Sequence, residues 1–192
     1  MSRRPRQESP TQVYHFINRG VNKKKIFHHA KDYNFYLGLL KEYCEKLNAQ
    51  IYHYCIMSNH AHLVLKAESL ESLSRFGHFT HRRYAYYYCK TYHWSEQVFR
   101  RNFMSVPILD DSYLLECGRY IERNPVDAKL VEKPEDHAYS SYLFYAEGKE
   151  TPLLTESPLY QNFGRSSLER QAAYKFYVCQ ERQEIKELTM PF

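Results

Sequence analysis

Two histidines, one residue apart, are the first residues whose types and spacing could support chemistry. His60 and His62 lie in the run HAHLVLKA (60–67), which has the composition of a β-strand. On a strand, residues i and i+2 point to the same face, with their Cα atoms roughly 6.5 Å apart. Two imidazoles at that spacing could bind one divalent ion, but they could equally be packed or exposed histidines. The motif alone leaves both interpretations open.

A tyrosine and an asparagine further along could complete such a site. Tyr120 and Asn124 are four residues apart in RYIERNPV (119–126), so in a helix they would share one face. The amide oxygen of Asn124 could be a third ligand, and histidine and asparagine with open positions suit magnesium or manganese better than structural zinc. Tyr120 would then lie about one turn away, where its phenol oxygen could attack a phosphate. Without further evidence, the simpler interpretation is that Asn124 caps the helix before Pro125 and that Tyr120 only packs.

Hydrophobic periodicity predicts the elements that would position these residues. Apolar residues recur at every third or fourth position in two long segments, and strand-forming residues fill the segments between them. The predicted order is a strand at 11–21, a helix at 32–47, a hairpin of strands at 51–57 and 60–67, a helix at 69–90, a strand at 97–109 and a helix at 110–124. This order predicts an α+β fold with helices packed on an antiparallel sheet.

The chain changes character after Val131. Proline, glycine, serine and threonine become frequent around one short helical patch, and a last helix is expected over 166–188. We therefore expect residues 1–131 to form the core, with a basic N-terminal arm, and residues 132–192 to form a C-terminal extension packed on or near it.

The distribution of charge indicates a phosphate-binding surface. The net charge is only +5, but the first 31 residues hold eight basic residues against one acidic residue, and residues 75–101 hold six against one. Together with 19 tyrosines, these segments fit a surface that contacts phosphates and stacks bases. A solvated basic face without a function would have the same composition.

Cysteine usage and hydropathy exclude several classes of protein. The five cysteines are scattered and lack CxxC spacing, which argues against a disulfide scaffold or a zinc ribbon and fits a reducing cytosol. No apolar stretch is long enough to span a membrane, and the N-terminus has no secretory signal. We therefore expect a cytoplasmic protein without a membrane partner.

Several motifs resemble those of one transposase family. The segment IMSNHAHLVL (56–65) is similar to the histidine–hydrophobic–histidine motif of the single-tyrosine HUH transposases. The segment 112–142, with Tyr120 before Ile-x-x-Asn-Pro-Val, resembles the REP-associated tyrosine transposases, and so do the arginine- and tyrosine-rich segment 81–103 and the tail element PLLTESPLY (152–160). The resemblance covers most of residues 12–180 in order.

The resemblance implies a fold and an activity. The fold would be a ferredoxin-like α+β core with the histidine pair on a central strand. His60, His62 and Asn124 would bind a divalent metal, Mg²⁺ or Mn²⁺, and Tyr120 would be the nucleophile. The activity would be cleavage and rejoining of single-stranded DNA at hairpins, through a 5′-phosphotyrosine and a free 3′-hydroxyl.

The same resemblance implies how DNA would be bound. The partner would be single-stranded DNA with a hairpin, in a bacterial, nucleoid-associated protein. The residues expected to contact DNA lie in the N-terminal arm and in the second long helix: Arg3, Arg4, Arg6, Arg82, Arg83 and Tyr86. We expect a monomer, with a dimer as the alternative.

In the motif that contains Tyr120, the chain differs from the family pattern at two positions. Glu122 and Arg123 stand where the family is often more apolar, so we expect both to be exposed.

Two other functions also fit the residues of the expected site. One rival is a binding protein that keeps hairpin recognition without cleavage. The other is a metal-dependent hydrolase in which water, not Tyr120, attacks the phosphate.

Overall fold

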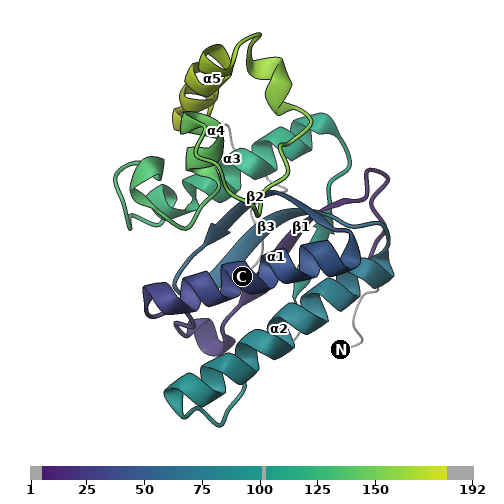
Figure 1. Cartoon of the computed structure of the whole chain (residues 1–192), viewed down its shortest axis with the longest axis vertical. Helices are drawn as coiled ribbons and strands as arrows, with labels where there is room; N and C mark the ends of the chain where they lie inside the picture. The colour runs from purple at the N-terminus through teal and green to yellow at the C-terminus, as the bar shows by residue number, and fades with distance from the viewer. Residues whose placement is uncertain (1–5, 101–102, 181–192) are drawn as a thin grey trace.

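A four-stranded antiparallel sheet lies at the centre of the molecule (Figure 1). The computed structural model describes residues 6–100 and 103–180. The strands are β1 (Val13–Arg19), β2 (Gln50–Ile56), β3 (His60–Lys66) and β4 (Met104–Pro107), in the order β2-β3-β1-β4. The predicted α+β class is confirmed, and the histidine pair begins β3, one of the two central strands.

Helices cover both faces of this sheet. Helices α1 (Ala30–Leu47) and α2 (Leu70–Tyr92) lie side by side on one face, and α3 (Asp111–Asp127) crosses the other (Figure 1). Because side chains alternate along a strand, Leu63 and Leu65 join the cluster under α1 and α2, whereas Val64 joins the cluster under α3. His60 and His62 share the parity of Val64, so both face α3.

Local signals in the sequence set the helix ends. The side chain of Ser69 accepts from the Ser72 backbone N–H at the start of α2, and Asp110 caps α3 by accepting from the Tyr113 N–H at 2.8 Å. The C-caps Asn48 and His93 adopt the left-handed conformation after α1 and α2.

Two predicted boundaries were wrong. The strand expected at 97–109 is limited to Met104–Pro107, and Phe99 forms a separate, isolated bridge to Gly20 directly after β1. Helix α3 does not end at Asn124 but contains Pro125. Pro125 has no N–H to donate to the carbonyl of the preceding turn, but the Ala128 N–H still donates to the Asn124 carbonyl at 3.0 Å, so the last turn forms.

The C-terminal part packs against α3 and the outer edge of β2. It contains α4 (Tyr142–Glu147), α5 (Ser167–Cys179) and the short 3-10 helices Pro134–Asp136 and Tyr160–Phe163; a further 3-10 helix, Val21–Lys23, follows β1. Leu154 and Ser140 form bridges to Ile51 and Cys55 of β2. The Tyr145 hydroxyl donates to the Tyr52 carbonyl at 2.6 Å. The last helix, predicted over 166–188, ends at Cys179, because Gln180 is already extended; the residues after 180 lie outside the described residues. The division at 131/132 stays a prediction.

Two other expectations can be compared with the structure. All five cysteines are free, as their scattered positions predicted. Within residues 6–100 and 103–180, no helix combines the length and the apolar character needed to cross a membrane.

Candidate active site

His60, His62 and Asn124 converge on the face of the sheet that α3 covers. The two imidazole rings have centroids 4.9 Å apart and are nearly perpendicular. The Nε2 atom of His60 lies 3.4 Å from the Oδ1 atom of Asn124 on α3. The two histidines share a strand face by alternation, and α3 packs over β2 and β3, so the helix brings the asparagine to them. The structure therefore brings together the three side chains predicted to bind a metal.

The Nδ1 atoms of His60 and His62 form hydrogen bonds, which leaves their Nε2 atoms to face another partner. His60 Nδ1 lies 2.5 Å from Asn59 Oδ1, which can only accept, so the proton is on Nδ1. His62 Nδ1 lies 2.9 Å from Nε2 of His15 on β1. His62 Nε2 is buried and has no hydrogen-bond partner within the described part of the chain. Metal-binding histidines usually have this arrangement, with the second nitrogen held by a neighbouring group.

Burial keeps these imidazoles neutral. Desolvation lowers the pKa of His60 to about 4, and the positive charge of Arg19 acts in the same direction. Desolvation, followed by the neighbouring His15 and His60, holds the pKa of His62 well below its usual value. A neutral imidazole keeps the lone pair that a metal needs. At neutral pH both side chains are therefore in the form that binds a cation.

The donor set fits a divalent cation only if Asn124 takes part. Among residues 6–100 and 103–180, no three histidine, cysteine, aspartate or glutamate side chains are grouped so that they could hold a metal. A site at His60 and His62 therefore needs the Asn124 amide oxygen as its third ligand. Two nitrogens and a neutral oxygen leave coordination positions and positive charge for a phosphate.

Tyr120 lies beside this cluster. It is partly buried on α3, four residues before Asn124, and its ring centroid lies 5.7 Å from that of His62, at an angle of 90°. The ring centroid of His15, on β1, lies 6.0 Å from that of Tyr120. The tyrosine predicted to act as a nucleophile is therefore next to the predicted metal ligands.

Several residues of the site were not found from the sequence. His15 is fully buried beside His62. The pairing of β1 with β3 sets Ile17 opposite His62, and His15 lies two residues from Ile17 on the same face of β1. Asn59 could have been suggested by its position directly before His60. Glu122 was expected to be exposed, but it is completely buried, because two of its partners, Ser141 and Tyr174, come from the C-terminal part. Arg123 was also wrongly expected to be exposed, since it is partly buried.

The residues predicted to contact DNA are not all in one place. Arg3 and Arg4 lie outside the described residues. Arg6 donates from Nη1 to the Ser74 hydroxyl at 2.9 Å, and both Arg6 and Arg82 line an open groove of about 480 Å³ between α2 and the segment that follows it. Arg83 instead forms an ion pair with Glu42 at 3.7 Å, and Tyr86 is 66% exposed on α2.

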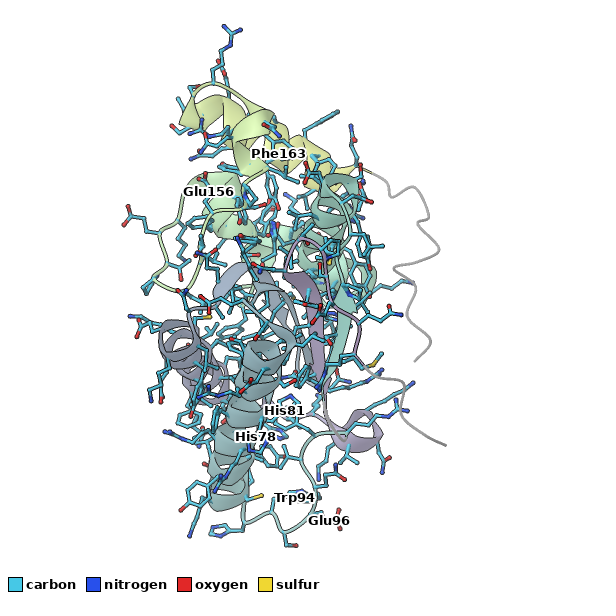
Figure 2. All side chains as sticks on the ribbon, turned by 90° about the vertical axis from the view of Figure 1, so that its right-hand side faces the viewer. His78, His81, Trp94, Glu96, Glu156 and Phe163 are labelled. Carbon is cyan, nitrogen blue, oxygen red and sulfur yellow. The ribbon has the colours of Figure 1, made fainter. Side chains whose placement is uncertain are left out.

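The groove has apolar walls and polar groups at intervals. Phe99 and Phe103 line it, and the Arg6 guanidinium lies 4.1 Å above the Phe103 ring. His81 stacks on Phe99 with ring centroids 4.1 Å apart, and its Nε2 has no hydrogen-bond partner in the described part of the molecule. Figure 2 shows His78 and His81 along α2, with Trp94 and Glu96 on the loop that follows. Aromatic walls with nearby cations are typical of single-strand binding grooves.

Known proteins similar to this chain point to one family. The sequence model described as "Transposase IS200 like" matches residues 9–124. A solved structure of a REP-associated tyrosine transposase bound to a REP hairpin superposes with a TM-score of 0.66 at 14% identity, covering 82% of this chain and 93% of that chain. At that identity the likeness shows a shared fold. No protein in the curated set matches significantly.

Proposed function

The chain belongs to the family of IS200-like transposases, and we propose that it cleaves and rejoins single-stranded DNA beside hairpins. The observation that carries the proposal is the convergence of His60, His62 and Asn124, with Tyr120 beside them. Each of these side chains has the chemical character that its role needs. The hairpin-bound transposase that shares the fold supports a hairpin as the substrate.

The proposed nucleophile is the phenol oxygen of Tyr120. A divalent ion, Mg²⁺ or Mn²⁺, held by His60, His62 and Asn124 would withdraw charge from the phosphate and stabilise the charge that develops on it. The Tyr120 oxygen gives up its proton and forms a bond to phosphorus, and the bond from phosphorus to the 3′-oxygen breaks as that oxygen takes up a proton from the solvent. The products are a 5′-phosphotyrosine and a free 3′-hydroxyl. Because the ester is conserved, attack by a 3′-hydroxyl on the phosphotyrosine rejoins the strand without ATP.

The proposed path of the DNA uses basic residues on both sides of the site. Arg19 ends β1 directly opposite His60, where its charge would attract a phosphate. Arg6 and Arg82 at the groove would contact the single strand that flanks the hairpin, and Arg3 and Arg4 would extend this contact. Arg83 and Tyr86 would contact the backbone further along α2.

The covalent adduct provides the test. Purified protein incubated with hairpin-bearing single-stranded DNA and Mg²⁺ or Mn²⁺ should form a protein–DNA adduct that migrates as one species on a denaturing gel. The Tyr120→Phe variant should form none, a loss of about 10⁴-fold or more in rate. Tyr113→Phe, on the same helix, is the matched control and should behave like wild type.

Three outcomes would contradict the proposal. An adduct that persists in Tyr120→Phe would exclude Tyr120 as the nucleophile. Free phosphate ends that are insensitive to Tyr120→Phe would indicate hydrolysis by water. Tight hairpin binding without cleavage in any divalent metal would indicate a binding protein.

We also propose a monomer that acts in the cytoplasm at the nucleoid, with residues 1–131 as the core and 132–192 as an extension. Sedimentation of the protein with and without a hairpin checks the first point, since a dimer would sediment at twice the mass.

A further inference from the structure

Glu122 is a carboxylate buried completely inside the molecule. Its Oε1 accepts from the Ser141 hydroxyl at 2.5 Å and from Nδ1 of His53 at 3.0 Å, and its Oε2 accepts from the Tyr174 hydroxyl at 2.8 Å. These donors come from β2, from the segment just before α4, and from α5. A buried carboxylate needs such partners to offset its desolvation. Glu122 therefore joins α3 to three other elements at one point.

This anchor lies on the opposite flank of α3 from the active-site residues. At about 100° per residue, Glu122 lies two residues from both Tyr120 and Asn124, so it is roughly 160° around the helix from each of them. Between the two flanks, Cys117 and Ile121 are fully buried in the cluster against the sheet. The helix is thus held at one flank and carries the site on the other.

The same flank sets how closely α3 approaches the sheet. A Cβ atom at Gly118 would lie 2.8 Å from Nε2 of His53, so only glycine permits this separation between α3 and β2. Gly118 lies four residues before Glu122, on the same side of the helix. The glycine contact and the glutamate hydrogen bonds together define the height and the rotation of α3.

The surroundings of Glu122 are closely packed. Tyr145 and Tyr174 lie with ring centroids 5.0 Å apart, and Tyr145 stacks on His53 at 4.6 Å. The cavity that these rings line with Phe163 has a volume of about 10 Å³, which is at most the size of one water molecule. Phe163 lies at the end of the molecule remote from Trp94 and Glu96 (Figure 2). Water therefore cannot easily replace a donor that is removed.

We propose that Glu122 is a positioning residue, which with Ser141 and Tyr174 sets the rotation of α3 and thereby places Tyr120 and Asn124 against the histidines of β3. A rotation of about 10° would move an atom about 6 Å from the helix axis by about 1 Å. A displacement of that size can reduce a reaction rate by about 10²-fold. The C-terminal part is then required for catalysis although it contributes no reacting group. The inference rests on the proposed function for the roles of Tyr120 and Asn124.

The test compares two hydroxyl deletions on α5. Tyr174→Phe removes one donor to Glu122 and keeps the ring. Tyr177→Phe is the matched control, because it removes a hydroxyl that donates at 2.8 Å to Glu116, a partly exposed glutamate of α3. At saturating hairpin DNA, Tyr174→Phe should form adduct about 10- to 100-fold more slowly, and Tyr177→Phe should stay within about twofold of wild type. Ser141→Ala should resemble Tyr174→Phe.

Two further measurements separate positioning from loss of structure. The dissociation constant for the hairpin in EDTA should not change in Tyr174→Phe, because the DNA-binding groove lies beside α2. The dissociation constant for Mn²⁺, measured by calorimetry below the melting temperature, should rise about 10-fold, because Asn124 moves with the helix. This measurement requires no cleavage.

The outcomes distinguish the inference from the proposed function. Wild-type protein that forms no adduct and binds no Mn²⁺ overturns both. An active wild type with unchanged rate and Mn²⁺ affinity in Tyr174→Phe and Ser141→Ala overturns only the role of Glu122. An equal loss in Tyr177→Phe also overturns it, because the effect would then come from the general attachment of α5.

Discussion

The two faces of the sheet differ in what they bury. Under α1 and α2, the buried side chains are almost all apolar or aromatic, including Phe16, Leu63, Leu65 and Phe76. Under α3, three histidines and a glutamate are buried among the apolar ones (His15, His53, His62 and Glu122), whereas the buried acid on the other side, among the described residues, is Asp32 of α1. Apolar burial stabilises a fold, whereas buried ionisable groups lower its stability unless they are paired. We therefore expect the α1/α2 face to supply most of the stability, and the α3 face to hold most of the buried ionisable groups that lower it.

Hydrogen bonding within the two central strands shows the same difference, although Nε2 of His81 on α2 also has no hydrogen-bond partner among the described residues. On the α1/α2 face, Asn18 is buried, but its side chain donates to the Tyr36 hydroxyl and accepts from the Ala61 N–H. On the α3 face, His15 Nδ1 and His62 Nε2 have no hydrogen-bond partner among the described residues. An unsatisfied buried polar atom costs about 1–3 kcal/mol. A site that keeps such atoms for a ligand depends on the opposite face for its stability.

The largest expected effect is on stability, at the α1/α2 face. Phe76 is fully buried, with its ring 5.7 Å from Phe16, so Phe76→Ala should lower the free energy of unfolding by about 3–5 kcal/mol. Tyr86→Ala, on the same helix but exposed, should change it by less than about 0.5 kcal/mol. Urea denaturation measures both. If Phe76→Ala costs no more than Tyr86→Ala, the α1/α2 face is not the source of stability.

The next effect concerns acid. Burial lowers the pKa of His60 to about 4 and that of His15 to about 3. Between pH 6.5 and about 4 the unfolded chain binds protons that the folded chain does not, so the free energy of unfolding must fall as the pH falls, by up to about 1.4 kcal/mol per pH unit for each histidine.

Urea denaturation at several pH values checks this slope. His60→Asn should reduce it by about one proton. His81, on α2, also has its pKa lowered to about 3 by burial, so His81→Phe should reduce the slope over the same range and further down to about pH 3. Equal slopes in wild type and His60→Asn would show that His60 is not protected from protonation.

A smaller effect, confined to the α3 face, should follow from removing Asn124. Asn124→Ala should weaken Mn²⁺ binding by about 10- to 100-fold and change the free energy of unfolding by less than about 1 kcal/mol, because the side chain is only partly buried. Calorimetry and urea denaturation measure the two quantities. Asp127→Ala, at the end of the same helix, is the control. A large loss of stability with unchanged Mn²⁺ affinity would make Asn124 a structural residue.

The smallest effect is expected at the surface of α2. Arg82→Ala should weaken hairpin binding and reduce the slope of log K against log salt by about one. Arg83→Ala should do less, because Arg83 already pairs with Glu42. Fluorescence anisotropy at several salt concentrations measures both slopes. If the two variants behave alike, the groove lined by Arg82 does not select the path of the strand.

Short-range patterns predicted most of the fold, and only together with the resemblance to the single-tyrosine transposases did they select the four residues expected at the site. The spacing of His60 and His62 on a strand and of Tyr120 and Asn124 on a helix was enough to place each pair on one face, and the order of elements was confirmed. The metal-binding and nucleophilic roles of these residues stay predictions, which the adduct assay tests.

What the sequence did not reveal depends on long-range contacts. His15 reaches His62 only through the register of β1 against β3, 47 residues apart. Glu122 looked like a surface residue because its donors Ser141 and Tyr174 come 19 and 52 residues later. The boundaries at 97–109 and at Pro125 were wrong for a different reason. The segment 97–109 pairs at two separate places, at Phe99 and at Met104–Pro107, and hydrogen bonds continue the helix past Pro125.

The bridges from Leu154 and Ser140 to β2 have a consequence for handling the protein. They cover the outer edge of a seven-residue strand, QIYHYCI, that is rich in aromatic and β-branched residues. An open edge of this composition is a template for pairing with strands of other molecules. A version of the protein that ends at residue 131 would expose that edge along its length. We therefore expect this shortened protein to aggregate during expression.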